Sequence, residues 1–333
     1  MKDKKTALRP LDLGLRRPML GVFVGAVFGT VLATSAHAQQ DSVDAHIAAA
    51  RAAAGEHAGM VDRLCPAPPS ESAAGGPRPR LSRDRDSWYH EPVKVFDNLY
   101  YVGMTEFSSW AVTTSEGIIV IDPIFDYSVE AEVVDGLRTL GFDPADIRYV
   151  LVSHGHLDHA GGAKFLQETF GARVVMGMAD WDMLDESNPS WKPRRDIEVD
   201  RDSTLSLGDT TLALYLTPGH TYGTISTLIP LRDGDAEHVA ALWGGTLFNF
   251  GPDAERFAAY AESAERFRAI TADAGADVLL SNHTDYDGSK EKLPAMANRA
   301  PGDPHPYVVG TESIGRYLTV AHECALAALA TVQ

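Results

Sequence analysis

The feature that most constrains the fold of this chain is a run of metal-binding residue types directly after an apolar segment. Residues 149–152 (Tyr-Val-Leu-Val) have the composition of a buried strand, and residues 153–159 follow as Ser-His-Gly-His-Leu-Asp-His. Three imidazoles and a carboxylate within six residues are hard to explain by packing alone. Neutral imidazole is the commonest protein ligand of zinc-like metals, and carboxylates often accompany it. The pattern therefore indicates an α/β scaffold that presents a metal at the carboxyl ends of its strands.

Two further histidines follow apolar strands in turn-like contexts. His220 lies in Thr-Pro-Gly-His-Thr after the predicted strand 212–216, and His283 lies in Ser-Asn-His-Thr after 278–280. A single loop histidine is usually a surface or hydrogen-bonded residue. Three strand ends that each carry imidazole favour one shared metal site at one edge of a sheet.

Strands and helices alternate along residues 88–333. Early strand pairs are predicted at 93–96 with 99–102 and at 109–113 with 117–122, and a hairpin turns at Gly208-Asp209. Apolar residues at helical spacing predict a helix that ends at Gly141 and a long amphipathic helix over 253–271. This order predicts an α/β fold with two mixed sheets and helices outside them.

The residues that carry these signals resemble the metallo-β-lactamase superfamily. The resemblance rests on the loop 153–159, on Thr-Pro-Gly-His-Thr around His220 and on His283, and it extends over roughly residues 88 to 290. It implies an αβ/βα four-layer sandwich with two Zn²⁺ ions per chain. The ligands carried over residue by residue fall into two sets of three: His154, His156 and His220 for the first zinc, and Asp158, His159 and His283 for the second. Three neutral imidazoles leave one tetrahedral position for water, and the anionic Asp158 offsets part of the second charge.

Residues beside this ligand set receive roles from the same resemblance. Asp122, which closes its strand before Pro123, resembles the carboxylate that orients a metal-binding histidine; a simple turn residue is the alternative. Asp158 is placed to orient the attacking hydroxide, which gives it a catalytic role as well. Thr221, Thr246 and Asn249 are candidates for binding a substrate carboxylate, with ordinary turn hydrogen bonding as the alternative.

One departure from the superfamily pattern separates its branches. Many members have a Gly-Asp-Thr segment whose aspartate ligates the metal, whereas this chain has Trp-Gly-Gly-Thr at 243–246, with Gly245 in place of the aspartate. No cysteine lies nearby, so the zinc-binding cysteine of the first two β-lactamase subclasses is absent too. The remaining set is most similar to the third subclass of metallo-β-lactamases.

The resemblance implies a zinc-dependent hydrolase whose metal-bound hydroxide opens a cyclic amide, with β-lactams as the first choice of substrate. A lactonase, an esterase or another amidase of the same fold is the alternative, because the metal ligands do not determine which acyl group is hydrolysed. An iron-dependent oxidoreductase of this fold would normally require the aspartate that Gly245 replaces. A metal-free binding protein would be expected to have lost ligands, and all six positions are filled.

The first 38 residues have the layout of an export signal. Basic residues precede an apolar stretch from about Met19 to Ala33, and Ala-His-Ala at 36–38 supplies a small-x-small cleavage site. A membrane anchor is the rival reading, and Arg16-Arg17 leaves a general or a twin-arginine export route open. Cleavage predicts a periplasmic or secreted protein with no membrane contact, a location where β-lactams act and where antibiotic resistance operates.

The signal carries six Lys or Arg and two Asp or Glu, so its removal takes the formal net charge from −17 to about −21. A domain this acidic repels phosphate backbones, which argues against nucleic acid as a partner and for a small-molecule substrate. Residues 39–87 form an arm, with an Ala-rich helix and then a Pro/Gly/Ser-rich linker, before the hydrolase domain at 88–333. Cys65 in the arm and Cys324 in the last helix are either a disulfide or two buried thiols. The sequence decides neither the role of the arm nor the oligomeric state.

Overall fold

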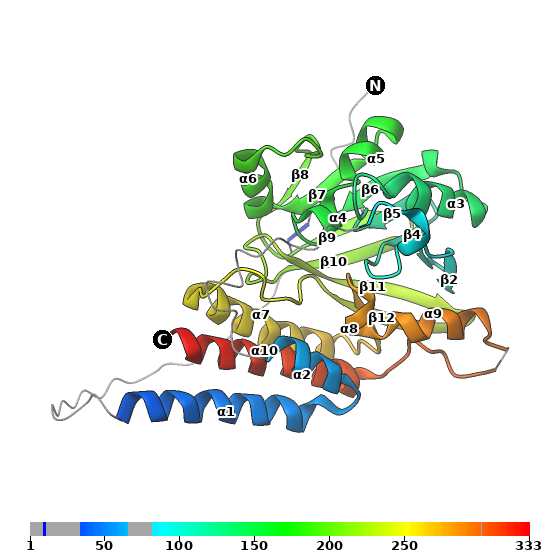
Figure 1. The fold of residues 1–333 in the computed structure, drawn as a ribbon. Coiled ribbons are helices and arrows are strands. Elements are labelled where there is room, and N and C mark those ends of the chain that lie inside the picture. The colour runs from blue at the N-terminus through cyan, green and yellow to red at the C-terminus, as the bar shows by residue number, and fades with distance from the viewer. Residues whose placement is uncertain (1–8, 11–33, 66–81, 301) are drawn as a thin grey trace.

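The computed structural model describes residues 9–10, 34–65, 82–300 and 302–333, arranged as two β-sheets with helices on both outer faces (Figure 1). The predicted αβ/βα sandwich is thus confirmed. Most of the predicted export signal and the linker at 66–81 lie outside the described residues. Within the described part, no helix combines the length and apolarity that crossing a bilayer requires.

The seven-stranded sheet is built from the first half of the domain in the order β2-β3-β4-β5-β6-β7-β8. Neighbouring strands are antiparallel from β2 to β5 and parallel from β5 to β8. Its strands are β2 (Val93–Phe96), β3 (Leu99–Tyr101), β4 (Trp110–Thr114), β5 (Gly117–Ile121), β6 (Ile147–Leu151), β7 (Arg173–Gly177) and β8 (Ile197–Val199). The parallel strands β5 and β6 end at the same edge, so Asp122 and the loop 153–159 leave the sheet side by side.

The six-stranded sheet follows in the chain, in the order β1-β9-β10-β11-β12-β13. All its pairs are antiparallel except β12 with β13. Its strands are β1 (Arg9–Pro10), β9 (Ser203–Leu207), β10 (Thr210–Leu216), β11 (Ile225–Asp233), β12 (Ala236–Trp243) and β13 (Val278–Ser281). The strands β10, β12 and β13 therefore run in one direction and end at one edge, where the segments that contain His220, Gly244 and His283 begin.

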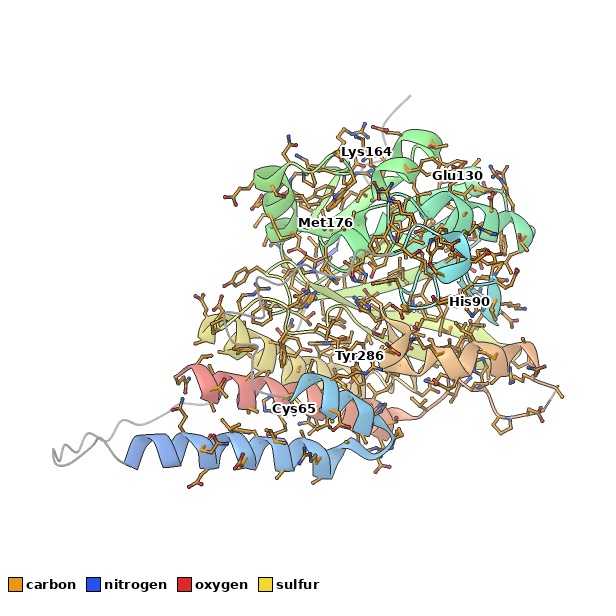
Figure 2. All side chains as sticks on the ribbon, in the orientation of Figure 1. Cys65, His90, Glu130, Lys164, Met176 and Tyr286 are labelled. Atoms are coloured by element: carbon orange, nitrogen blue, oxygen red, sulfur yellow. A yellow bond between two sulfur atoms is a disulfide. The ribbon has the colours of Figure 1, made fainter. Side chains whose placement is uncertain are left out.

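Three apolar layers hold the sandwich together, and the side chains in Figure 2 fill the spaces between the ribbons. The central layer joins the facing sides of the two sheets, for example Trp110 and Val175 from one and Leu214 and Leu242 from the other. The outer layers lie under the helices. Burial of each large apolar side chain contributes about 1.5–3 kcal/mol, so the central layer fixes the position of one sheet on the other.

The helices divide between the two outer faces. The seven-stranded sheet is covered by α3 (Asp135–Thr139), α4 (Leu157–Ala160), α5 (Ala163–Phe170) and α6 (Met178–Ser187). The other sheet is covered by α7 (Ala254–Asp273) and α10 (Thr311–Val332), while α1 (Thr34–Ala54) and α2 (Ala58–Leu64) pack on α10. The helices α8 (Thr284–Asp287) and α9 (Ser289–Ala297) follow β13. The predicted helices that end at Gly141 and cover 253–271 are present as α3 and α7, whereas α6, α8, α9 and the strand β8 were not predicted.

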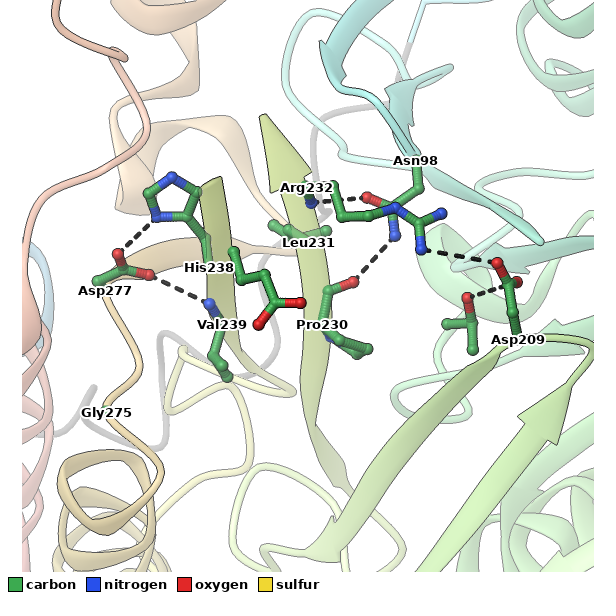
Figure 3. Close-up of a pocket in the computed structure, with 11 residues that line it drawn as sticks. Asn98, Asp209, Pro230, Leu231, Arg232, His238, Val239, Gly275 and Asp277 are labelled. Carbon is green, nitrogen blue, oxygen red and sulfur yellow. Dashed lines mark hydrogen bonds and ion pairs between the residues drawn. The ribbon is translucent and has the colours of Figure 1, made fainter. Parts of the chain in front are cut away.

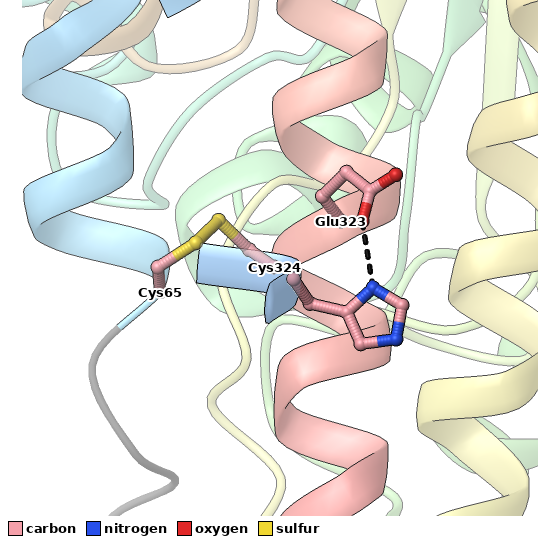
Figure 4. The surroundings of a disulfide bond; sticks show 4 residues. Cys65, Glu323 and Cys324 are labelled. Atoms are coloured by element: carbon pink, nitrogen blue, oxygen red, sulfur yellow. Dashed lines mark hydrogen bonds and ion pairs between the residues drawn. A yellow bond between two sulfur atoms is a disulfide. The ribbon is translucent and has the colours of Figure 1, made fainter. Parts of the chain in front are cut away.

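The described part of the arm packs on the last helix and is tied to it covalently. α1 and α2 join the apolar layer of α10, with a break at Gly55, whose φ of +52° favours glycine. Cys65 and Cys324 form a disulfide, so the first of the two alternatives from the sequence is confirmed (Figure 4). Next to it, Nδ1 of His46 lies 2.7 Å from Oε2 of Glu323.

Replacing both Cys65 and Cys324 by serine is expected to lower the free energy of unfolding by about 2–4 kcal/mol, because the bond closes a loop of 259 residues in the unfolded chain. Denaturant unfolding of the variant and of the parent, each with and without reductant, measures this. Reductant should destabilise the parent to the level of the variant and leave the variant unchanged. A variant as stable as the oxidised parent would contradict the expected contribution.

A buried carboxylate in the helical turn Glu130–Val134, directly before α3, makes stability depend on pH. Glu132 accepts a hydrogen bond from the backbone N–H of His90 at 3.1 Å, and burial raises the pKa of its carboxyl from 4.5 to about 8. The folded protein therefore holds this proton more tightly than the unfolded chain does. The stability that this proton contributes is lost as the pH rises from about 4.5 to about 8.

Glu132→Gln, which mimics the neutral form, is expected to flatten this pH dependence. The loss of unfolding free energy between pH 5 and pH 8 should be smaller in the variant by on the order of 1–3 kcal/mol. Urea titrations across this range measure it, and Glu130→Gln, an exposed glutamate of the same segment, is the control. Parallel curves for Glu132→Gln and Glu130→Gln would contradict the assignment.

Candidate metal centre

The six side chains that the sequence nominated as metal ligands come together where the two sheets end. They form two groups of three: His154, His156 and His220, and Asp158, His159 and His283. Within each group the possible ligand atoms all lie within 4.8 Å of one another. Each group takes two side chains from residues 154–159 after β6 and one from a segment that follows a strand of the six-stranded sheet.

The first group has the spacing of a zinc site. Nε2 of His220 lies 3.0 Å from Nε2 of His154 and 3.1 Å from Nδ1 of His156. Zinc–nitrogen bonds of about 2.0–2.1 Å in a tetrahedron place ligand nitrogens about 3.3 Å apart. A single ion between these three nitrogens therefore fits with only small adjustments.

Backbone carbonyls determine which nitrogens face the centre of this group. Nδ1 of His154 donates to the carbonyl oxygen of Gly244 at 2.8 Å, and Nδ1 of His220 donates to that of Leu247 at 2.5 Å. A carbonyl only accepts, so each Nδ1 carries the proton and each Nε2 keeps a lone pair. Such contacts orient metal-binding histidines and fix their tautomer.

The second group combines two imidazoles with a carboxylate. Nε2 of His159 lies 3.2 Å from Oδ2 of Asp158 and 3.3 Å from Nε2 of His283, and the distance from His283 to Asp158 is 3.8 Å. Nδ1 of His159 faces Oδ2 of Asp122 at 3.0 Å, which directs Nε2 toward the centre of the group. This set also suits zinc, which accepts nitrogen and carboxylate ligands.

Asp122 occupies the place that its proposed orienting role requires. It is buried and, besides contacting His159, accepts hydrogen bonds from the backbone N–H of Ser153 at 2.7 Å and from its hydroxyl at 2.6 Å. Its φ is +55°, and Ile124 in the same turn has φ +48°. Positive φ in residues other than glycine costs about 1–3 kcal/mol, so the remaining contacts must hold this turn in place.

The charges around the two groups differ. Burial, followed by repulsion from neighbouring imidazoles, lowers the pKa values of His154 and His220, so both are neutral near pH 7 and can bind metal without losing a proton. Burial and His159 likewise lower the pKa of His283 to about 4. Burial would also lower the pKa of His159, but Asp158 and Asp122 outweigh it and raise that pKa to about 10.

The same balance acts on Asp158. Its burial would raise the pKa of the carboxyl, yet His159 and then His283 lower the pKa below its ordinary value. In the second group, the anionic carboxylate of Asp158 therefore lies next to a position that favours positive charge. A divalent cation meets that preference.

Gly245 lies directly against a ligand of the first group. A Cβ atom at this position would lie 2.6 Å from Cβ of His220 and 2.8 Å from its ring. Contacts shorter than 3.0 Å do not occur between such atoms, so any side chain at 245 displaces His220. Packing against His220 therefore favours glycine at this position.

The three polar residues nominated for substrate binding differ in their surroundings. The hydroxyl of Thr221 lies 2.7 Å from Oδ2 of Asp180, and that of Thr246 lies 3.2 Å from the hydroxyl of Tyr317; both threonines are buried. Asn249 is exposed. Of the three, Asn249 alone presents its side chain to solvent.

Sequence reasoning missed several contacts that shape the centre. Asn282 is buried beside His154 and donates to the carbonyl oxygen of Gly244 at 2.8 Å and to Oγ of Ser153 at 3.2 Å. Ser153 and Asn282 each precede a ligand histidine, and this adjacency was the available signal. No sequence signal marks the carbonyl groups of Gly244 and Leu247, because every residue has a backbone carbonyl.

Exposed apolar side chains lie close in sequence to the ligands. Among the described residues, the large apolar side chains with substantial exposure are Leu157 (37%), Met178 (41%) and Tyr222 (49%). Leu157 lies between two ligands and Tyr222 follows His220 by two residues. Met178 follows Gly177, whose backbone packs against that of Gly223. Such exposed apolar groups next to buried polar ones are typical of a small-molecule site.

A cavity lies away from the ligand groups, at the opposite ends of β12 and β13 (Figure 3). It has a volume of about 480 Å³ and contains one imidazole, His238, paired with Asp277 at 2.6 Å. In the described part of the chain, the two groups at the other edge are the sets of three potential ligands that converge. They are therefore the stronger candidate for the functional site.

Comparison with known proteins agrees with this geometry. The model of the metallo-β-lactamase superfamily matches residues 107–234. A crystal structure of a subclass B3 metallo-β-lactamase from Bradyrhizobium japonicum superposes with a TM-score of 0.62 and 27% identity, over 72% of this chain and 94% of that one.

Curated relatives with other activities also match. A hydroxyacylglutathione hydrolase of Acidiphilium cryptum is 32% identical over 143 residues, which are 43% of this chain and 50% of the relative. An N-acyl homoserine lactonase of Rhizobium radiobacter is 33% identical over 111 residues, 29% of this chain and 41% of the relative. The chain spans about half the length of these relatives or less, so the similarity covers only part of each protein.

Proposed function

We propose that this chain, which matches the metallo-β-lactamase superfamily model over residues 107–234, is a dizinc hydrolase that opens β-lactam rings. The proposal rests on that match and on the six-ligand centre. The observation that carries the proposal is the pair of ligand groups, which meet at one edge without a bridging carboxylate or a cysteine. Gly245 occupies the position where a bridging aspartate would lie, and it packs against His220.

The side chains of the centre have two roles, metal binding and orientation of the attacking water. His154, His156 and His220 would hold one ion, and Asp158, His159 and His283 the other. When bound, two zinc ions lower the pKa of a shared water to near neutrality and polarise the carbonyl group that the water attacks. Asp158 is partly exposed, so we assign its carboxylate the task of accepting a hydrogen bond from the attacking water and orienting it.

The β-lactam ring suits a centre of this kind. Ring strain weakens the amide that must be broken, so the departing nitrogen needs no strong general acid. The exposed apolar groups Leu157, Met178 and Tyr222 would contact the substituents of an amphipathic substrate. Asn249 is the remaining candidate for its carboxylate.

The second candidate is a lactonase or thioesterase of the same fold. It is favoured by the partial matches to a homoserine lactonase and a hydroxyacylglutathione hydrolase. The same ligand set would serve either reaction, since the metal ions it would hold act on a carbonyl oxygen and a water, which β-lactams, lactones and thioesters all use.

Export to the periplasm belongs to the same proposal. The basic and apolar pattern of residues 1–38 supports it, and so does the Cys65–Cys324 disulfide, because disulfides persist mainly in oxidising compartments. Analysis of the mature amino terminus of the exported protein tests it, with cleavage after Ala38 as the expected result.

Metal analysis and a substrate panel test the proposed activity. Purified mature protein should contain about two zinc ions per chain and should hydrolyse a chromogenic cephalosporin with kcat/KM of at least about 10⁴ M⁻¹s⁻¹. Homoserine lactones and glutathione thioesters should be at least about tenfold poorer substrates. A preference for lactones or thioesters would favour the second candidate, and bound iron or absence of metal would contradict the dizinc centre.

A further inference from the structure

We propose that Asp180 and Arg256 are positioning residues that clamp the His220 segment from two sides and thereby set the geometry of the first ligand group. This inference rests on the proposed function, because it treats His220 as a metal ligand. Neither residue belongs to a ligand motif. They come from different helices, α6 and α7, and contact the same short segment, residues 219–223.

Asp180 joins the two loops that supply the first group. Its carboxylate is 1% exposed and accepts three hydrogen bonds: from the backbone N–H of Gly155 at 2.7 Å, from the hydroxyl of Thr221 at 2.7 Å and from the backbone N–H of Gly223 at 2.9 Å. Gly155 lies between the ligands His154 and His156, and Thr221 directly follows the ligand His220. One carboxylate therefore fixes the distance between the two loops.

Arg256 holds the other side of the same segment. Its Nε donates to the carbonyl oxygen of Gly219 at 3.1 Å, and its Nη2 donates to the carbonyl oxygen of His220. The guanidinium is half-buried and lies over the ring of Phe250 at 3.9 Å, with the ring of Tyr222 at 5.6 Å. These contacts hold the planar group in one orientation, which a flexible ammonium would not reproduce.

The carboxylate of Asp180 is buried, so hydrogen-bond donors must replace the water that it has lost. An unpaired carboxylate in the interior is costly, and here three donors compensate for the lost water. Because those donors all belong to the two ligand loops, the compensation depends on the loops being in place. The clamp is therefore expected to stiffen the backbone of His220, while the carbonyl of Leu247 orients its ring.

The second ligand group has supports that Asp180 and Arg256 do not provide. Asp122 contacts His159, and the segment before His283 is held by Asp287, which accepts the backbone N–H groups of Ser281 at 2.9 Å and Ser289 at 2.9 Å. Loss of the clamp should therefore weaken metal binding at the first group selectively. A residue with a merely structural role would weaken both groups or neither.

Calorimetric zinc titration of the metal-free full chain separates the two groups. A His283→Ala background isolates the first group, and a His220→Ala background isolates the second. In the first background, Asp180→Asn is expected to raise the zinc Kd about 10–100-fold, and Arg256→Gln about tenfold. In the second background, both changes should alter the Kd by less than about threefold.

Asp196→Asn is the matched control. Its carboxylate also accepts a backbone N–H, that of Val174 at 3.1 Å, and pairs with Arg194 at 3.2 Å, but neither contact belongs to a ligand loop. Zinc Kd in both backgrounds should stay within about threefold of the parent. If Asp180→Asn does not fold, as judged by circular dichroism, Thr221→Val removes one of its three hydrogen bonds and should raise the first Kd about three- to tenfold.

Equal weakening of both groups, or an unchanged Kd at the first group, would overturn the clamp. These readouts use zinc alone, so a failure of β-lactam hydrolysis leaves them intact. Zinc that binds to neither group in the parent would instead contradict the proposed metal centre, and the clamp with it.

Discussion

Replacing His220 by alanine is expected to remove one of two bound zinc ions and to lower kcat/KM for a chromogenic cephalosporin about 10³-fold. His220 is the one ligand of the first group that follows a strand of the six-stranded sheet, and its Nε2 lies within 3.1 Å of both partner nitrogens. Loss of an ion that activates water and polarises the carbonyl is worth several kcal/mol in the transition state, and each 1.36 kcal/mol corresponds to a tenfold rate change. Metal content by mass spectrometry and initial rates measure both effects.

Two companion variants make this result specific. His283→Ala should remove the other ion and leave the first group able to bind zinc. His238→Ala changes an imidazole in the distant cavity and should leave zinc content at about two ions per chain. Retention of both ions by His220→Ala would mean that His220 is not a ligand.

Gly245→Ala is expected to weaken zinc binding at the first group about 10–100-fold and to destabilise the fold by about 1–3 kcal/mol. The added methyl carbon would lie 2.6 Å from Cβ of His220, so the histidine or the segment 244–248 must move. The carbonyl of Gly244 orients His154, and a shift of this segment disturbs that ligand as well. Zinc titration and thermal unfolding measure the two consequences.

Gly59→Ala is the control for this substitution. Gly59 is exposed in α2, and a Cβ there meets no atom within 4 Å. Alanine at an open helical position stabilises by roughly 0.5–1 kcal/mol, and zinc affinity should not change. Gly245→Asp tests the same contact with aspartate, the residue of the Gly-Asp-Thr segment in many metallo-β-lactamase superfamily members. Full zinc affinity in Gly245→Asp would show that the backbone adapts and that packing does not require glycine.

The strands and ligands that were predicted correctly have strong local signals. The strands Ile147–Leu151 and Val278–Ser281 are mostly apolar, with runs at 149–152 and 278–280, and the turn at Gly208-Asp209 marks its hairpin. His220 and His283 stood out because each follows such a run. Since β10, β12 and β13 share one direction, their ends had to meet, and the approach of these histidines follows from topology.

The elements that escaped prediction lack those signals. α6 begins Met-Ala-Asp-Trp-Asp and is rich in acidic residues, so its apolar face is short, and β8 has only three residues. Asp180 looked like any exposed acidic residue of such a helix, although the structure buries it among three donors. Its environment is created by residues 155, 221 and 223, which are distant in sequence, and no local pattern reports it.

The arrangement of ligands across two sheets has a consequence for assembly of the molecule. Residues 93–199 build one sheet and residues 203–281 the other, apart from β1, and the exposed residues Asp200 and Arg201 join these two parts. Each proposed ion would bind two ligands from the first part and one from the second. Because ligands that bind only the folded state stabilise it, zinc supply would then govern how firmly the two parts associate. The chain can be regarded as two complementary fragments on one polypeptide, and the proposed metal ions would join them through ligands from both.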